Sequence, residues 1–257
     1  MAVTTLVRHT VEGPVARFTL DSPANRNALS TRLIDELHRG LDDVLGNPAL
    51  RAVVLGHTGG TFCAGVDLAQ VSSERSAAEG DDHMDGLVKL LRRILELPVP
   101  VIAAIDGHVR AGGLGLAAAC DIAVAGPSST FALTEARIGV APGIISMTLL
   151  PRVSPRASDR YFLTGEKFGA REAAEMGLVT IAAEDVEATV SDLAAAIALG
   201  SPQGLRSSKA LTTEPVLEIF DRRADRLARN AARLFDSAEA REGIAAFRER
   251  RQPNWIQ

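Results

Sequence analysis

The sequence predicts an α/β fold in which a parallel sheet is covered by helices on both faces. Three segments, 51–57, 101–105 and 121–126, are nearly continuous apolar runs, which is typical of parallel strands buried on both sides. Amphipathic helical periods separate these runs, so strands and helices alternate along the chain. With 257 residues, 46% of them hydrophobic, the chain is large enough to bury an extensive core.

The first fifty residues predict a hairpin followed by a helix. Apolar and polar residues alternate on both sides of Glu12-Gly13-Pro14, as in two strands joined by a turn. The segment 21–27 then has the composition of a loop, and Ser30 is a residue type that caps helices. Apolar residues recur at helical spacing from Leu33 until the sequence at 46–48 ends the pattern.

The middle of the chain predicts two glycine-containing loops that follow strands. One loop, 59–68, follows the strand 51–57, and a later helix ends near Leu97. The other, AGGLGLAAACD at 111–121, opens a short alanine-rich helix. Residues 106–110 separate this second cluster from the strand before it.

The glycine cluster has the spacing of a dinucleotide-binding fingerprint over residues 113–118. Its surroundings argue against that function, because residues 106–110 interrupt the preceding strand and the following helix is too short. We therefore expect no nicotinamide cofactor. A helix N-terminus still offers unpaired N–H groups, and two amides from two such loops suit a carbonyl oxygen that becomes an enolate.

The last hundred residues predict mainly helices. Strand signals fade after about Ala157, and apolar residues between Leu217 and Leu234 recur at alternating intervals of three and four. We expect that helix to cover either the core of its own chain or a subunit interface. Asp236 with Glu239 predicts a capping box for one more helix.

Charge and cysteine content exclude several classes of partner. Lys and Arg total 28 against 32 Asp and Glu, without a basic block, so nucleic acid is not expected as a partner. The N-terminus lacks a targeting pattern and no apolar run is long enough for a membrane span, which predicts a cytoplasmic protein that binds no membrane. Cys63 and Cys120 lack the spacing of a metal site, so we expect buried free thiols and no bound metal.

Four segments resemble the successive signatures of the crotonase superfamily, also called the enoyl-CoA hydratase/isomerase family. They are FCAGVDL, IDGHVRAGGLGLAAACDIAVAG, FALTEARIGVAPG and LTGEKFGAREAAEMGLV, and the flanking SPANRNALS and EGIAAFRERRQP are similar to that family as well. The resemblance covers nearly the whole chain. It implies a spiral of ββα units over residues 1–196, and a helical region at 197–257 that covers the active site and forms homotrimers, often paired into hexamers.

The resemblance also implies roles for individual residues. The N–H groups of Val66 and Gly112 would form an oxyanion hole for the thioester carbonyl of an acyl-CoA substrate. Glu135 matches a catalytic glutamate of the family hydratases, and its alternative is a surface glutamate paired with Arg137. The residues that would contact the substrate are Ala24, Arg26, Ala28, Ala64, Asp67, Leu68 and Gly115. Coenzyme A is part of the substrate, so no separate cofactor is implied.

Gly115 departs from the family pattern and leaves the reaction open. Family hydratases usually carry the first of two glutamates there, one helical turn after Gly112. Hydration of a 2-enoyl-CoA to a 3-hydroxyacyl-CoA is the leading prediction, because it is the commonest activity in the family. The alternatives are a 3-enoyl-CoA to 2-enoyl-CoA isomerase, which needs one base, a CoA-ester-binding protein with weak catalysis, or another reaction of the superfamily. Arg110 and the polar residues at 81–85 are candidates to compensate for the missing carboxylate.

Overall fold

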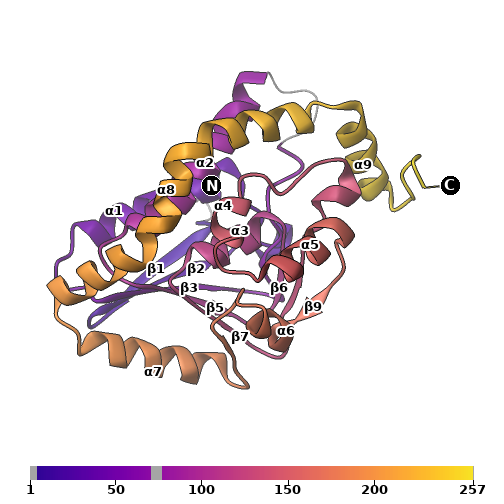
Figure 1. Cartoon of the computed structure of the whole chain (residues 1–257). Helices are drawn as coiled ribbons and strands as arrows, with labels where there is room; N and C mark the ends of the chain where they lie inside the picture. The colour runs from indigo at the N-terminus through magenta and orange to yellow at the C-terminus, as the bar shows by residue number, and fades with distance from the viewer. Residues whose placement is uncertain (1–4, 71–76, 257) are drawn as a thin grey trace.

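The computed structural model describes residues 5–70 and 77–256, with side chains in helix α2 from Met84 onward. Within these residues the strands form two sheets (Figure 1). The larger sheet has the order β1-β2-β3-β5-β7-β10 and the smaller one β4-β6-β8-β9. The strands are Val7–Glu12 (β1), Val15–Leu20 (β2), Ala52–His57 (β3), Thr61–Cys63 (β4), Val101–Ile105 (β5), His108–Arg110 (β6), Ile122–Ala125 (β7), Thr130–Ala132 (β8), Phe168–Gly169 (β9) and Ile181–Ala182 (β10).

Helices connect and cover these strands. The α-helices are Thr31–Leu45 (α1), Ala77–Glu96 (α2), Gly112–Ala119 (α3), Ser146–Leu149 (α4), Pro155–Thr164 (α5), Ala170–Glu175 (α6), Val186–Ala198 (α7), Pro202–Phe235 (α8) and Ala238–Glu249 (α9). Two 3₁₀ turns complete the described elements, Pro23–Asn25 (η1) and Glu135–Ile138 (η2).

The chain winds as a spiral of strand–strand–helix turns, which confirms the predicted architecture. In the pairs β3/β4, β5/β6 and β7/β8, the first strand joins the larger sheet and the second joins the smaller one. Within each sheet, successive turns add a parallel strand beside the previous one. The segments that follow β4, β6 and β8 therefore emerge at the same edge of the smaller sheet.

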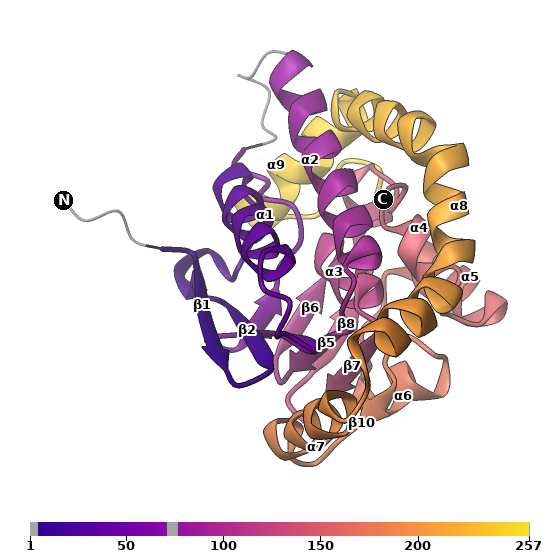
Figure 2. The ribbon, with the colours of Figure 1, turned by 90° about the vertical axis from the view of Figure 1, so that its left-hand side faces the viewer.

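Apolar side chains fill both sides of the larger sheet, as its continuous apolar strands predict. Val54, Ile102 and Val124 form one cluster with Val190 of α7, which lies alone below the sheet in Figure 1. The main core lies on the other side, where α1, α2 and α3 cover the sheet, and α8 arches over that layer (Figure 2). Helices thus shield the parallel strands from water on both faces.

The predicted elements of the N-terminal half are confirmed. β1 and β2 form an antiparallel hairpin, and the Ser30 hydroxyl accepts the N–H of Leu33 as the N-cap of α1. The strands at 51–57, 101–105 and 121–126 appear as β3, β5 and β7.

Three local predictions are wrong. Residues 106–110 contain β6, so a strand runs almost directly into the glycine cluster, and the predicted loop 59–68 contains β4. Strands of two or three residues are too short to produce an alternation that sequence reasoning can detect. The cap of α9 is Ser237, whose hydroxyl accepts the N–H of Ala240, and Asp236 instead ends α8.

The long helix α8 contacts the core through an ion pair of the buried Lys209. Lys209 lies 5% exposed, and its ammonium lies 2.9 Å from the Asp121 carboxylate and donates to the carbonyls of Ile94 and Val99. Helix α7 ends at Ala198 and α8 begins at Pro202, so the predicted division at 196/197 falls within the last turn of α7.

Candidate active site

Three consecutive strands of the smaller sheet carry the three predicted catalytic groups just beyond their carboxyl ends. Val66 follows β4, Gly112 follows β6 and Glu135 follows β8. β6 pairs in parallel with both β4 and β8, and the N–H of Ala111 donates to the carbonyl of Ala132 where β6 and β8 end. Segments about seventy residues apart in sequence thus meet at one sheet edge, where open α/β sheets commonly bind ligands.

The backbones at Val66 and Gly112 lie against each other. A β-carbon added to Gly112 would lie 3.4 Å from the Val66 nitrogen, and one added to Gly65 would lie 3.0 Å from the Gly112 nitrogen. Gly65 also has φ +88°, a conformation that side-chain-bearing residues rarely adopt. Glycine at position 65 therefore lets the two amides approach closely.

In the described part of the chain no hydrogen bond uses the N–H of Val66 or of Gly112. Among the described residues, the N–H of Val66 is left free by the way Leu29 pairs with this segment. The N–H of Leu29 donates to the carbonyl of Gly65, and its carbonyl accepts the N–H of Asp67, on either side of Val66. The N–H of Val66 then points away from Leu29, since successive groups of an extended strand alternate in direction.

Gly112 begins helix α3, so its N–H has no partner within the helix and lies at the positive end of the helix dipole. The preceding Ala111 has φ +46° and ψ −119°, an unfavourable conformation for alanine that costs about 1 to 3 kcal/mol. Strained backbone of this kind concentrates at functional sites. Here it forms the sharp turn between β6 and α3 that leaves the Gly112 amide at the sheet edge.

Glu135 is a buried carboxyl group without a counterion. The residue is 8% exposed, and its Oε2 atom has no hydrogen-bond partner among the described residues. Burial raises the pKa of Glu135 from 4.5 to about 7. The alternative, an ion pair with Arg137, is not found, since that guanidinium donates to the carbonyl of Thr164. A buried carboxyl that titrates near neutrality suits proton transfer.

Helix α9 packs against the turn that holds Glu135. A β-carbon added to Gly243 would lie 2.6 Å from the carbonyl carbon of Ile138, so the backbones of α9 and η2 are in direct contact. Arg248 of the same helix donates to the carbonyl of Leu68, in the loop after β4. The C-terminal helix therefore contacts two of the segments that carry the predicted site residues.

Six of the seven predicted substrate contacts, all except Gly115, lie in two segments that are hydrogen-bonded to each other. The N–H of Ala64 donates to the carbonyl of Arg26, next to the Leu29 pairing described above. Ala24 and Arg26 are exposed, Ala28 is buried, and the segment 64–68 is largely half-buried. The two segments are therefore neighbours in the fold, and the role of their residues in substrate binding stays a prediction.

Asn27 organises this loop and was not identified from the sequence. It is fully buried, its side-chain oxygen accepts the N–H of Ser22, and its amide donates to the carbonyls of Thr58 and Thr61. The only available signal was the residue type, because asparagine tolerates the left-handed region better than most residues, and Asn27 adopts it with φ +52°.

Gly115 lies one turn along α3 and is covered by Ile145. A β-carbon added to Gly115 would overlap the Ile145 side chain, lying 2.7 Å from its Cβ atom. Ile145 is 3% exposed and directly precedes α4. No sequence spacing indicates this contact.

Three situations apply to the polar residues predicted to replace the carboxylate missing at position 115. Arg110 is hydrogen-bonded elsewhere, Asp85 is exposed, and the side chains of the others lie outside those described. The half-buried Arg110 donates to the carbonyls of Val109 and Thr130 and to the Thr130 hydroxyl, and burial lowers its pKa. Asp85 is exposed on α2, whereas the side chains of residues 81–83 lie outside those described. Arg110 thus stabilises the smaller sheet.

Both cysteines are buried free thiols, as predicted. Burial raises the pKa of Cys63 and that of Cys120 to about 12, so neither is a thiolate near neutral pH. Among the described residues no group of three or more His, Cys, Asp or Glu side chains is arranged to hold a metal ion. None of the described helices has the length and apolar character needed to cross a bilayer.

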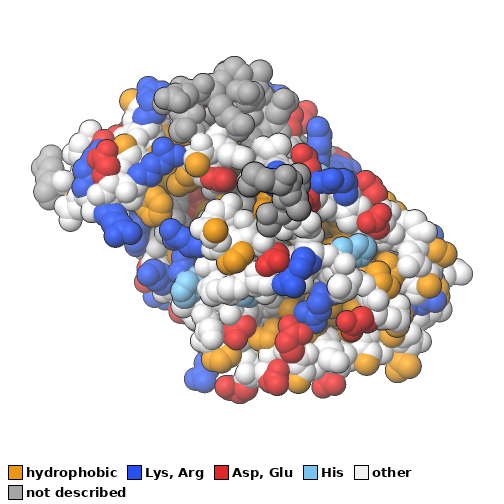
Figure 3. Space-filling model, turned by 180° about the vertical axis from the view of Figure 1, so that it is seen from behind, with side chains coloured by type: hydrophobic (Ala, Val, Ile, Leu, Met, Phe, Trp, Pro, Cys, Tyr) orange, Lys and Arg blue, Asp and Glu red, His pale blue; other side chains and the backbone are white. Residues whose placement is uncertain are grey.

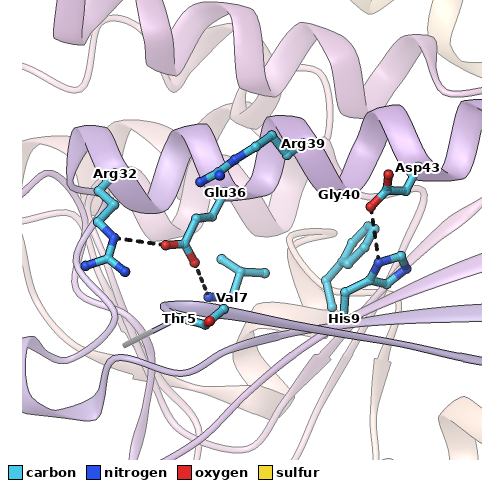
Figure 4. A pocket seen from close by; sticks show the side chains of 9 residues that line it. Thr5, Val7, His9, Arg32, Glu36, Arg39, Gly40 and Asp43 are labelled. Atoms are coloured by element: carbon cyan, nitrogen blue, oxygen red, sulfur yellow. Dashed lines mark hydrogen bonds and ion pairs between the residues drawn. The ribbon is translucent and has the colours of Figure 1, made fainter. Parts of the chain in front are cut away.

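Elsewhere the surface carries features that are separate from the candidate site. A hollow of about 400 Å³ lies between β1 and α1, where Glu36 accepts the N–H of Val7 and pairs with Arg32, and His9 faces Asp43 (Figure 4). No predicted site residue lines it.

Acidic and basic side chains are interspersed on the face shown in Figure 3, unlike the uniformly basic stripe that follows a phosphate backbone.

Comparison with known proteins agrees with the architecture and the motifs. A model of the family described as enoyl-CoA hydratase/isomerase matches residues 10–257. The chain belongs to this family. A crystal structure of an enoyl-CoA hydratase from Mycobacterium avium superposes with a TM-score of 0.92 at 60% identity, covering 98% of this chain and 100% of that one.

More distant family members are also similar over more than nine tenths of their length. An enoyl-CoA hydratase of Mycobacterium tuberculosis is 33% identical over 250 residues, which are 92% of this chain and 91% of that protein. A carnitinyl-CoA dehydratase of Proteus mirabilis is 30% identical over 254 residues, 96% of each chain. The predicted membership of the crotonase superfamily is confirmed, and this family of enzymes includes more than one reaction on CoA esters.

Proposed function

We propose that this protein hydrates a 2-enoyl-CoA to a 3-hydroxyacyl-CoA. The N–H groups of Val66 and Gly112 hold the thioester oxygen, and Glu135 moves the protons. The observation that carries the proposal is the pair of adjacent, unused amides at one sheet edge, next to the strand that leads to a buried carboxyl. Family members named as enoyl-CoA hydratases at 33% and 60% identity support the choice of reaction.

The reaction balances with one carboxyl group. Glu135 as carboxylate takes a proton from water while the water oxygen bonds to C3 of the enoyl chain. The electrons of the C2–C3 double bond move toward the thioester, whose oxygen becomes an enolate held by the two amides. The protonated Glu135 then returns its proton to C2, which completes the addition of one water.

The raised pKa of Glu135 fits both halves of this cycle. At about 7, the carboxylate that accepts a proton and the acid that returns it are present in similar amounts at neutral pH. Each amide of the hole contributes about 3 to 4 kcal/mol when it binds developing negative charge. These amides need no reorganisation during the reaction, because helix α3 and the strained turn at Ala111 hold the Gly112 side in place.

A second candidate reaction is isomerisation of a 3-enoyl-CoA to a 2-enoyl-CoA. It is favoured by the packing of Ile145 against Gly115, which leaves no room for a second carboxyl there. In this reaction Glu135 removes a proton from C2, the enolate forms in the same hole, and the proton returns at C4. One base is sufficient because no water has to be positioned.

We further propose that the loops 24–28 and 64–68 bind the coenzyme A part of the substrate, with Arg26 near its phosphates. Arg26 is exposed at the end of η1, and Asp67 and Leu68 lie in the loop to which it is hydrogen-bonded through Ala64. Coenzyme A enters as part of the substrate, so the proposal includes no other cofactor.

The proposed assembly is a homotrimer or a hexamer of two trimers, built through the helical region 197–257. Exposed apolar side chains on α8 and α9 support it, notably Leu211 at 74% and Phe247 at 58% exposure. Light scattering of the purified protein measures the assembly, and a monomer at micromolar concentration contradicts this part of the proposal.

The test is a panel of 2-enoyl-CoA and 3-enoyl-CoA esters followed by absorbance of the conjugated thioester and by product mass. Hydration removes the absorbance and adds one water to the mass, whereas isomerisation creates the absorbance without a change of mass. Glu135→Gln serves as the control, since it should bind butyryl-CoA and turn over neither ester. Binding without turnover of any ester by the wild-type protein contradicts both reactions and favours a CoA-ester-binding function.

A further inference from the structure

The contact between Gly115 and Ile145 leaves no volume for a side chain on α3 at position 115. A β-carbon there would overlap the Ile145 Cγ2 atom, lie 2.7 Å from Cβ and lie 3.4 Å from Cα. Rotation about the first side-chain torsion moves Cγ2 but leaves Cβ in place. A residue larger than glycine at 115 therefore requires a shift of the backbone or the loss of the isoleucine side chain.

The backbone at Ile145 is held against such a shift. The buried hydroxyl of Thr148 lies 3.1 Å from the carbonyl of Gly115 and 3.1 Å from that of Ile145, so it joins the two sides of the contact. The N–H of Leu149 donates to the same Ile145 carbonyl as α4 begins. Moving Ile145 away from α3 would break these buried bonds.

Position 115 is functionally sensitive because it lies one turn after Gly112. Residues three apart on a helix lie on the same side, so a side chain at 115 would be near the proposed thioester site. In this chain that volume holds the apolar side chain of Ile145, which can neither hold a water molecule nor exchange a proton.

We propose that Ile145 determines reaction specificity by occupying the volume of a second carboxyl group, which keeps proton transfer on Glu135 alone. This inference rests on the proposed function of the site. It predicts that Glu135 alone transfers the protons in either candidate reaction, and that the Gly115–Ile145 pair must change together for a two-carboxyl hydratase to arise.

The steric part is tested by thermal denaturation of four proteins. Gly115→Ala should lower the Tm of the wild-type protein by about 3 to 10 °C, because overpacked cores are strained. The same substitution in an Ile145→Gly background should lower it much less. Equal losses in the two backgrounds overturn the proposal.

The functional part is tested by the ratio of hydration to isomerisation. Gly115→Glu/Ile145→Gly should raise this ratio about tenfold over Ile145→Gly, since a positioned acid or base contributes at least that much. The matched control is Gly115→Gln/Ile145→Gly, which has the same volume without the acid and should leave the ratio unchanged. Binding of butyryl-CoA checks that each site is intact, and equal ratios in intact Glu and Gln variants contradict the role of Ile145.

If the double variants fail to bind butyryl-CoA, Ile145→Ala tests the role of Ile145 instead. It opens space for water beside Gly115, so the ratio should rise roughly threefold over wild type. Ile102→Ala removes the same side chain from the opposite side of the larger sheet and should not change the ratio. An unchanged ratio in Ile145→Ala overturns the proposal. Wild-type protein that binds butyryl-CoA but converts neither ester contradicts the proposed function instead, and with it any role in choosing the reaction.

Discussion

Glu135→Gln should make this protein inactive and, at neutral pH, more stable. Burial raises the pKa of Glu135 from 4.5 to about 7, so keeping it ionised in the folded state costs free energy. In the unfolded chain the carboxyl loses its proton near pH 4.5, and in the folded protein only near pH 7. Between these values the folded state binds more protons, so the free energy of unfolding falls as the pH rises.

The size of this effect follows from the pKa difference. At about 1.4 kcal/mol per pH unit, the cost reaches about 3 kcal/mol above pH 7 and vanishes below about pH 4.5. Glutamine has nearly the same shape and cannot ionise, so it removes the pH-dependent part. The stability of Glu135→Gln relative to wild type should therefore increase by about 2 to 3 kcal/mol between pH 5 and pH 8.

Denaturant unfolding of both proteins at several pH values measures this difference, and turnover of enoyl-CoA esters is measured on the same samples. Turnover should fall about 10² to 10⁴-fold, the usual contribution of a general acid or base. Glu184→Gln, a change at an exposed glutamate, is the control and should alter neither quantity. If the difference in free energy of unfolding between Glu135→Gln and wild type is the same from pH 5 to pH 8, the argument that burial raises this pKa is refuted. Full activity of Glu135→Gln would refute the catalytic role.

Three further predictions concern the same site and its support. The kcat/KM for hydration should rise through about pH 7 and then level off, because the buried carboxyl must be ionised to accept a proton, and a flat profile from pH 5.5 to 8.5 contradicts this. Gly65→Ala should lower kcat about a hundredfold, since its β-carbon would lie 2.9 Å from the Ala111 Cβ atom beside the proposed hole, whereas Gly60→Ala, with nothing within 4 Å, should be neutral. Lys209→Met should lower the free energy of unfolding by about 3 to 5 kcal/mol, because it leaves the Asp121 carboxylate, only 14% exposed, without its partner, and a loss below about 1 kcal/mol in urea unfolding contradicts that reasoning.

Local patterns in the sequence were sufficient for the elements that they encode directly. The cap at Ser30, the hairpin before it and the apolar strands are produced by interactions within a few residues or by burial on both faces, and these predictions are confirmed. The family motifs identified the segments that carry Val66, Gly112 and Glu135, and the family itself is confirmed. Strands as short as β6 escaped detection because three residues carry no usable period.

Only the tertiary structure decided the contacts between segments that are far apart in the chain. The closeness of Gly112 to Val66 depends on the parallel pairing of β4 with β6, and the raised pKa of Glu135 depends on how many atoms exclude water from it. Gly115 shows most clearly the difference between what the sequence and the tertiary structure reveal. The sequence identified the missing glutamate at that position, but the volume that it would need is taken by Ile145, thirty residues later. Spacing along a chain determines which residues share a helix or strand, whereas packing between elements determines which side chains a site has room to hold.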